Sequence, residues 1–270
     1  MEVIDWSPER DSSIKEKEFL IHEKYHEALV EKYTSERQVF NSFRKFRIHA
    51  LNRGIKHFGS LSGDVLEIGA GDGWCSAYVL KNYKVNSIHT MEITKAATNR
   101  LIPHVFDICG VDKSRATLIR GSFNQIDSTD AYDHILSMGA IHHSENLQLT
   151  LDNVYNALKP GGVFIAQEPG MIDSTPNSFY HSRNEKVANF KKIVQVTNKE
   201  RSDIFYRKCE YLTAAYHSGF EVHVKWIFPQ NRWYRRLLNI DPKLETNKAN
   251  NLLLVLRKPE GESPYRVTRW

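Results

Sequence analysis

The stretch Asp64-Val-Leu-Glu-Ile-Gly-Ala-Gly-Asp-Gly73 decides the fold of this chain. A short β-type run at 65–68 passes into a turn with glycine at positions 69, 71 and 73, and a helical stretch begins near Trp74. Glycines let a backbone turn tightly and approach a ligand without interference from a Cβ atom. The stretch therefore predicts a strand, a ligand-binding turn and a helix in succession.

The chain beyond Gly63 repeats this β-α order. Further strands are expected at residues 87–91, 116–119, 134–138, 163–167, 221–226 and 252–257, and helices at 74–81, 95–109, 147–158 and 210–218. Strands that alternate with helices are typical of a mainly parallel sheet covered by helices. With residues 65–68, these runs predict a seven-stranded α/β sheet.

The first 60 residues have the apolar spacing of amphipathic helices. One helix is expected over 12–33, and a second from Ser35, with Gln38 completing a capping box, to a stop at Gly54. We interpret residues 1–60 as a helical cap, acting either as a lid or as packing against the sheet. Residues 61–270 are expected to form the main domain. This domain contains an insertion at 169–208 with a helix around 186–196 and a second insertion at 229–250, and it ends in a mobile tail from 264.

Composition narrows the class of protein. Apolar residues make up 41% and charged residues 26%, which is ordinary for a globular domain. No apolar run is long enough to span a bilayer and the N-terminus does not resemble a signal peptide, so we expect a cytoplasmic protein. The three cysteines lack metal-site or disulfide spacing and are interpreted as reduced thiols in the core, and no metal is expected.

The net charge of +5 is too small by itself to indicate nucleic-acid binding. Two basic clusters, Arg44 to Arg47 and Arg232 to Arg236, are interpreted as solvated helix faces. Nucleic acid is therefore not the expected partner.

The glycine spacing separates two kinds of cofactor. A dinucleotide turn needs glycine at 69, 71 and 74, whereas this chain has Trp74 there and places its third glycine at 73. The pattern Glu67-x-Gly69-x-Gly71-x-Gly73 instead resembles the first motif of class I S-adenosylmethionine-dependent methyltransferases. The resemblance covers roughly residues 60 to 260 and implies a Rossmann-like fold with an antiparallel last strand and S-adenosyl-L-methionine as cofactor.

The same resemblance implies cofactor-binding residues. Glu67 would lie near the methionine amino end, with Gly69, Gly71 and Gly73 beneath the cofactor. Glu92, at the end of the second strand, matches the acidic residue that accepts hydrogen bonds from both ribose hydroxyls.

Two later segments match the adenine side and the floor of the cofactor site. Ser122 stands where the family often has Asp and would accept from the adenine amino group, with Phe123 packing on the ring or in the core. Met138 and Gly139 fall where the backbone lines the cofactor.

Two histidines follow the segment that matches the fourth strand of the family. His142 and His143 fall near the substrate pocket, where either could take a proton from an acceptor as the methyl group transfers. The alternative is a structural pair that opens the next helix. Glu168, at the end of the fifth strand, either faces the pocket or is an ordinary loop carboxylate.

The leading hypothesis is methyl transfer to a small-molecule acceptor, with O-methylation slightly favoured over N-methylation. An RNA or protein acceptor, a NAD-dependent oxidoreductase and a non-catalytic Rossmann-like subunit remain alternatives. The acceptor and the oligomeric state have no signal in the sequence.

Overall fold

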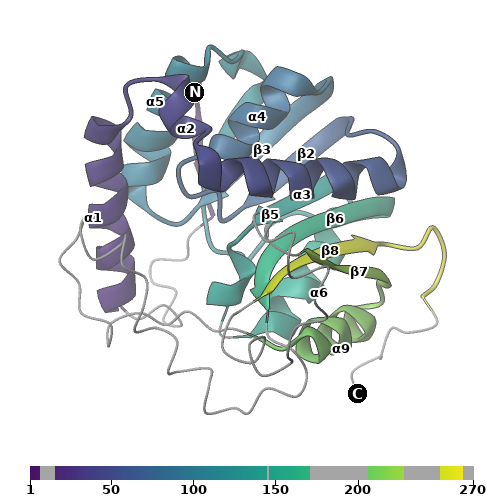
Figure 1. Cartoon of the computed structure of the whole chain (residues 1–270). Coiled ribbons are helices and arrows are strands. Elements are labelled where there is room, and N and C mark those ends of the chain that lie inside the picture. The colour runs from purple at the N-terminus through teal and green to yellow at the C-terminus, as the bar shows by residue number, and fades with distance from the viewer. Residues whose placement is uncertain (7–15, 145, 171–205, 228–249, 264–270) are drawn as a thin grey trace, which may run out of the picture.

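The computed structural model describes residues 1–6, 16–144, 146–170, 206–227 and 250–263, which form a sheet between two layers of helices (Figure 1). The strands of the sheet are β1 (Val3–Asp5), β2 (Gly63–Ile68), β3 (Val85–Glu92), β4 (Ala116–Arg120), β5 (Tyr132–Met138), β6 (Leu158–Gly170), β7 (Glu221–Ile227) and β8 (Asn250–Arg257).

The strand order is β1-β4-β3-β2-β5-β6-β8-β7. β1 to β6 pair in parallel, and β8 pairs antiparallel with both β6 and β7. The mainly parallel sheet with an antiparallel last strand is therefore confirmed. The order reverses between β2 and β5, and the crevice at such a point is where open α/β sheets bind ligands.

The sheet has eight strands, not the seven expected, because Val3–Asp5 adds an edge strand beside β4. The Trp6 N–H extends this pairing by donating to the Arg120 carbonyl at 2.9 Å. The expectation that residues 1–60 are entirely helical was wrong here. A three-residue strand is too short to show an alternating pattern, and its pairing depends on the open edge of β4.

The helices are α1 (Glu16–Lys32), α2 (Glu36–Val39), α3 (Ser42–Phe58), α4 (Trp74–Asn82), α5 (Ile102–Cys109), α6 (Leu147–Ala157) and α9 (Lys208–Ser218). In Figure 1, α3 and α4 lie on one side of the sheet, and α6 and α9 lie on the other. Alternation along β2 explains the two layers: Val65 packs into the core beneath α3 and α4, whereas Leu66 packs into the core beneath α6 and α9.

The expected second N-terminal helix is two helices. The backbone leaves the helical region at Phe40, and α3 then continues through Gly54 to Phe58. A Cβ atom at Gly54 would lie 2.6 Å from Cγ2 of Ile165, so this glycine permits α3 to approach β6 instead of ending the helix. The prediction of a stop at Gly54 was wrong because close packing and helix termination both favour glycine.

Several expectations fall outside the described residues: the helix around 186–196, most of both insertions, the Arg232 to Arg236 cluster and the tail.

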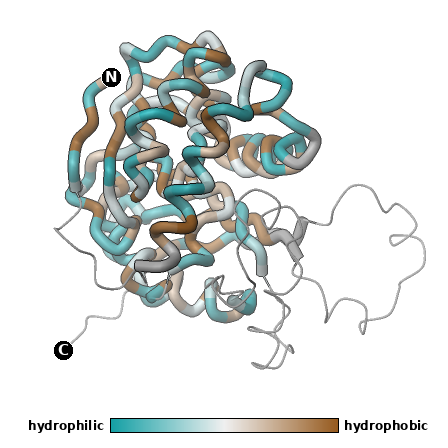
Figure 2. The backbone as a smooth tube through the Cα atoms, turned by 90° about the vertical axis from the view of Figure 1, so that its left-hand side faces the viewer, coloured by the Kyte–Doolittle hydropathy of each residue, from teal (hydrophilic) through white to brown (hydrophobic). Residues whose placement is uncertain are grey.

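Figure 2 shows hydrophilic stretches interrupting the hydrophobic ones along the described chain. Among those residues, every helix is too short or too polar to span a lipid bilayer.

Candidate functional site

The turn between β2 and α4 contains three glycines with left-handed backbone angles. Their φ values are 62° at Gly69, 59° at Gly71 and 77° at Gly73. A Cβ atom at Gly69 would lie 2.3 Å from the Cβ of Ala140, and one at Gly73 would lie 2.8 Å from Cγ2 of Ile102. One at Gly71 would meet no atom of the described chain within 4 Å. Gly69 and Gly73 therefore allow the turn to pack closely against its neighbours, and Gly71 leaves room for a ligand.

Glu92 ends β3 beside this turn. Its Oε2 accepts from the Gly71 N–H at 2.8 Å, and its Oε1 accepts from the N–H groups of Ile93 at 3.0 Å and Thr94 at 3.4 Å. Burial raises the pKa of Glu92, while the Gly71 hydrogen bond and the charge of His22 act in the opposite direction. A carboxylate offers about four lone-pair positions. The structure thus couples Glu92 to the middle glycine and leaves it capacity to accept a further hydrogen bond.

Glu67 lies in β2, just before the turn, and its side chain binds the first turn of α4. Its Oε2 accepts from the Ser76 N–H at 2.8 Å and from the Ser76 hydroxyl, which itself receives a hydrogen bond from Thr90 at 2.8 Å. Burial raises the pKa of Glu67 to about 8. The resemblance implied a place near the methionine end of the cofactor, whereas the hydrogen bonds of this carboxylate in the structure join β2 to α4.

Ser122 and Phe123 lie just after β4. The N–H of the residue before Ser122 donates to the Glu92 carbonyl at 3.2 Å, and the Ser122 hydroxyl accepts from the Asn124 N–H at 3.2 Å. The Phe123 ring reaches to 3.8 Å from where a Cβ atom at Gly69 would lie. Both residues are therefore close to the glycine turn and to Glu92, as the motif order predicted.

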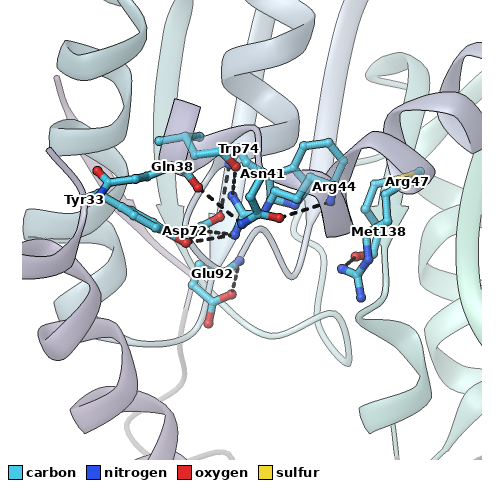
Figure 3. A network of polar contacts seen from close by, with 11 residues as sticks. Tyr33, Gln38, Asn41, Arg44, Arg47, Asp72, Trp74, Glu92 and Met138 are labelled. Atoms are coloured by element: carbon cyan, nitrogen blue, oxygen red, sulfur yellow. Dashed lines mark hydrogen bonds and ion pairs between the residues drawn. The ribbon is translucent and has the colours of Figure 1, made fainter. Parts of the chain in front are cut away.

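Met138 ends β5 and lies beside Arg47 of α3 (Figure 3), and Gly139 follows it. Nη1 of Arg47 donates to the Met138 carbonyl at 2.5 Å. A Cβ atom at Gly139, where φ is 87°, would lie 2.7 Å from Nη2 of Arg47. Burial lowers the pKa of Arg47, and the charge of Glu168 opposes that shift. A guanidinium group therefore lies at the point where the strand order reverses.

Asp72 connects the glycine turn to the N-terminal helices (Figure 3). Its Oδ2 accepts from the Tyr33 hydroxyl at 2.8 Å and pairs with Arg44, and its Oδ1 accepts from the Trp74 N–H at 3.3 Å. The Arg44 guanidinium also lies over the Trp74 ring, 5.6 Å from its centroid. Only 12% of the Arg44 side chain and 3% of the Asp72 side chain are exposed. This buried pair holds the turn against α3.

The two candidate histidines lie in a short helical turn, Ile141–His143, after β5. Nδ1 of His142 is 2.8 Å from Oε2 of Glu168, and the rings of His142 and His143 are 4.1 Å apart. Glu168 is fully buried near the end of β6. Of the two alternatives for Glu168, the loop carboxylate is wrong, because Glu168 lies within β6.

Helix α1 brings two further histidines to this region. The His22 ring meets the His143 ring edge-on, with centroids 5.5 Å apart, and Nδ1 of His26 is 2.7 Å from the Thr94 hydroxyl. Burial lowers the pKa of His26 to about 4, so this ring is neutral near pH 7. Helix α1 thus lies beside both the loop after β3 and the histidine pair.

Sequence reasoning missed Arg44, Arg47 and Asp72. The interpretation of Arg44 to Arg47 as a solvated face was wrong for Arg44, which is paired with Asp72, and for Arg47, which donates to the Met138 carbonyl. A usable signal existed, because Arg47 precedes the buried Leu51 by one helical turn and so lies on the same face. Asp72, between two glycines, had no pattern of its own.

Two negative findings concern metals and thiols. In the part of the chain that the structure describes, no group of three His, Cys, Asp or Glu residues could hold a metal ion. Cys75 and Cys109 are buried, and Cys209 is exposed. The expectation of buried core thiols therefore holds for two of the three and is wrong for Cys209.

Comparisons with known proteins agree with this geometry. A family model for a methyltransferase domain matches residues 66–164, from β2 to β6. YdaC of Bacillus subtilis, described as an uncharacterized methyltransferase, is 28% identical over 144 residues, which are 51% of this chain and 74% of YdaC.

Solved structures share the fold. Phosphoethanolamine N-methyltransferase 2 of Haemonchus contortus, in complex with S-adenosyl-L-methionine, has a TM-score of 0.63 and 16% identity, covering 94% of this chain and 62% of that chain. YcgJ of Bacillus subtilis has a TM-score of 0.60 and 15% identity, covering 79% of this chain and all of that chain. The Rossmann-like fold that the sequence predicted is therefore confirmed.

Proposed function

We propose that this chain, in which a model for a methyltransferase domain matches residues 66–164, is a class I S-adenosylmethionine-dependent methyltransferase that transfers a methyl group to a small-molecule acceptor, with a hydroxyl slightly favoured over an amine. The observation that carries the proposal is the pairing of Glu92 with Gly71 at one side of the glycine turn and of His142 with Glu168 at the other. One pair suits a ribose, and the other suits a proton acceptor.

The residues present fit the cofactor. The space beside Gly71 is where a side chain would otherwise stand, and Glu92, which accepts three backbone hydrogen bonds, retains about one of its four lone-pair positions for a hydroxyl donor. Ser122, Phe123 and the backbone at Met138 would complete the cofactor site, with Gly69 and Gly73 setting the path of the turn and Glu67 fixing that turn to α4. When bound, the cofactor supplies an electrophilic methyl group on a sulfonium.

The chain's own residues then have to orient an acceptor and remove its proton. Positioning supplies most of the rate when the methyl donor is already activated. His142 and His143 are the proposed groups at the acceptor. His142 would take the proton of an acceptor hydroxyl, because a neutral imidazole is a base near pH 7.

We propose that α1 and α3 form a cap over this site. Arg44 and Tyr33 bind Asp72 in the turn, and His22 contacts His143. These contacts join the first 60 residues to both halves of the proposed site. The insertions at 169–208 and 229–250 are proposed to complete the acceptor pocket.

N-methylation is the second candidate. The Haemonchus contortus neighbour is a phosphoethanolamine N-methyltransferase, and phosphoethanolamine is a small amine. An amine acceptor that arrives unprotonated needs no base, so the two acceptor classes differ in their dependence on His142.

The test uses the purified chain with S-adenosylmethionine labelled at the methyl carbon. Panels of small alcohols, sugars and amines are compared with RNA and with unmodified protein. We expect label in a small molecule, and a Tm raised by S-adenosylmethionine but not by NAD. Label in RNA or protein, or stabilisation by NAD alone, would refute the proposal.

A further inference from the structure

Glu168 accepts hydrogen bonds from the end of β5 and from the loop that follows it. Its Oε1 accepts from the Ser137 hydroxyl at 2.8 Å and from the N–H groups of Ala140 at 3.0 Å and Ile141 at 3.3 Å. Its Oε2 faces His142, with 2.8 Å to Nδ1 and 3.4 Å to the backbone nitrogen. Oε1 of Glu168 therefore binds the end of β5 and the loop after it, and Oε2 binds His142.

The donors around Glu168 require an ionised carboxylate. Burial alone would raise its pKa, but the hydrogen bond and charge of His142, with the Ala140 N–H and the Ser137 hydroxyl, lower the pKa of Glu168. An ionised carboxylate only accepts hydrogen bonds. Nδ1 of His142 must then carry the hydrogen, and in the neutral ring Nε2 has the lone pair.

We propose that Glu168 is a positioning residue for methyl transfer, which fixes His142 as the Nδ1–H tautomer and makes Nε2 the proton acceptor. The role of Glu168 in methyl transfer rests on the proposed function, whereas the assignment of the His142 tautomer does not. As the acceptor oxygen forms its bond to the methyl carbon and the carbon–sulfur bond breaks, the acceptor proton moves to Nε2. The resulting imidazolium is balanced by Glu168 and later releases its proton to solvent.

Other charged or titratable groups face this pair. Arg47 of α3 interacts electrostatically with Glu168, and the His143 ring stacks against His142, with His22 of α1 beyond it. Arg47 is cationic and favours the ionised carboxylate. A pH profile alone would therefore mix several groups, so the test reads the tautomer directly.

The decisive variant is Glu168→Gln. Its amide oxygen can keep the bonds from Ser137, Ala140 and Ile141, while its NH₂ group faces Nδ1 and would donate to it. Nδ1 then becomes the acceptor and the hydrogen moves to Nε2. Ser137→Ala is the matched control, because it removes a hydrogen bond from Oε1 without altering the group that faces His142.

The tautomer is measured by nitrogen-15 NMR of the histidine-labelled protein above pH 7, without acceptor, with a His142→Ala spectrum assigning the signal. We expect Nδ1–H in the wild type and Ser137→Ala, and Nε2–H in Glu168→Gln. Nε2–H in the wild type would overturn the proposal, and this result needs only the wild type and a folded His142→Ala protein, not a folded Glu168→Gln variant.

The transfer rate separates this inference from the proposed function. With an acceptor identified, Glu168→Gln should lower kcat by at least about a hundredfold, with S-adenosylhomocysteine affinity unchanged. A switched tautomer with unchanged kcat would overturn the catalytic part of the proposal. Absence of methyl transfer from the wild type to any acceptor would refute the proposed function and leave the tautomer assignment standing.

Discussion

Replacement of Arg44 by methionine should destabilise the protein by about 3 kcal/mol, the lower end of the range for removing one partner of a buried ion pair. The substitution removes the guanidinium from Asp72, whose side chain is 3% exposed. The cost stays near the lower end because Asp72 keeps the Tyr33 hydroxyl and the Trp74 N–H as donors. Methionine retains much of the apolar length of the arginine stem.

The assay is urea unfolding followed by tryptophan fluorescence, since the indole of Trp74 lies beneath Arg44. The partner variant is Arg44→Met with Asp72→Asn, which removes both charges and leaves a side chain that still accepts from Tyr33. We expect the double variant to recover to within about 1 kcal/mol of the wild type, because no buried charge is left uncompensated. The same ordering should appear in Tm.

Two results would refute this reasoning. A loss below about 1 kcal/mol in Arg44→Met would place the pair in the class of exposed ion pairs. A double variant as unstable as the single one would mean that packing of the arginine stem, and not charge, holds α3 to the turn.

Two pH-dependent effects follow from buried groups. Glu67 has its pKa raised to about 8 by burial, so the stability that its protonated form contributes is present below about pH 4.5 and lost as pH rises toward 8. Glu67→Gln should therefore gain stability relative to the wild type between pH 5.5 and 8.5 in urea unfolding, and parallel curves would contradict the shift. His26 has its pKa lowered to about 4, so its contribution is present above pH 6.5 and lost as pH falls toward 4. Wild-type stability relative to His26→Gln should therefore decline from pH 7.5 to 5, and an unchanged difference would refute the burial of the neutral ring.

The sheet was largely predictable because its strands are short apolar runs with clear boundaries. Val65 to Ile68 and Val163 to Gln167 fall within β2 and β6 of the structure. The edge strand Val3–Asp5 was not predictable, since its pairing depends on an unoccupied edge of β4 and not on its own pattern. Local sequence carries propensity, but it does not carry the identity of a distant partner.

The candidate site also contains residues that the sequence could predict and residues that it could not. Gly71 and Glu92 could be placed by motif spacing, and they form a hydrogen bond at 2.8 Å. The contacts of Asp72 with Arg44 and of His142 with Glu168 join residues far apart in sequence. Charge runs such as Arg44 to Arg47 favour a solvated interpretation in isolation, and only the position of Asp72 explains why Arg44 is buried.

The central claim is that Glu92 and the glycine turn bind S-adenosylmethionine. It is tested most directly by calorimetric titration of S-adenosylhomocysteine into the wild type, Glu92→Ala and Glu36→Ala. Glu36 is the control because its carboxylate is exposed and pairs with Lys81 at 2.5 Å. Circular dichroism establishes that each variant is folded.

We predict saturable binding to the wild type and to Glu36→Ala. Binding to Glu92→Ala should be weaker by about 1 to 3 kcal/mol, or roughly 5- to 150-fold, through the loss of a charge-assisted hydrogen bond to the ribose. Equal affinity in the wild type and folded Glu92→Ala, or no binding to the wild type at millimolar ligand, would contradict the account.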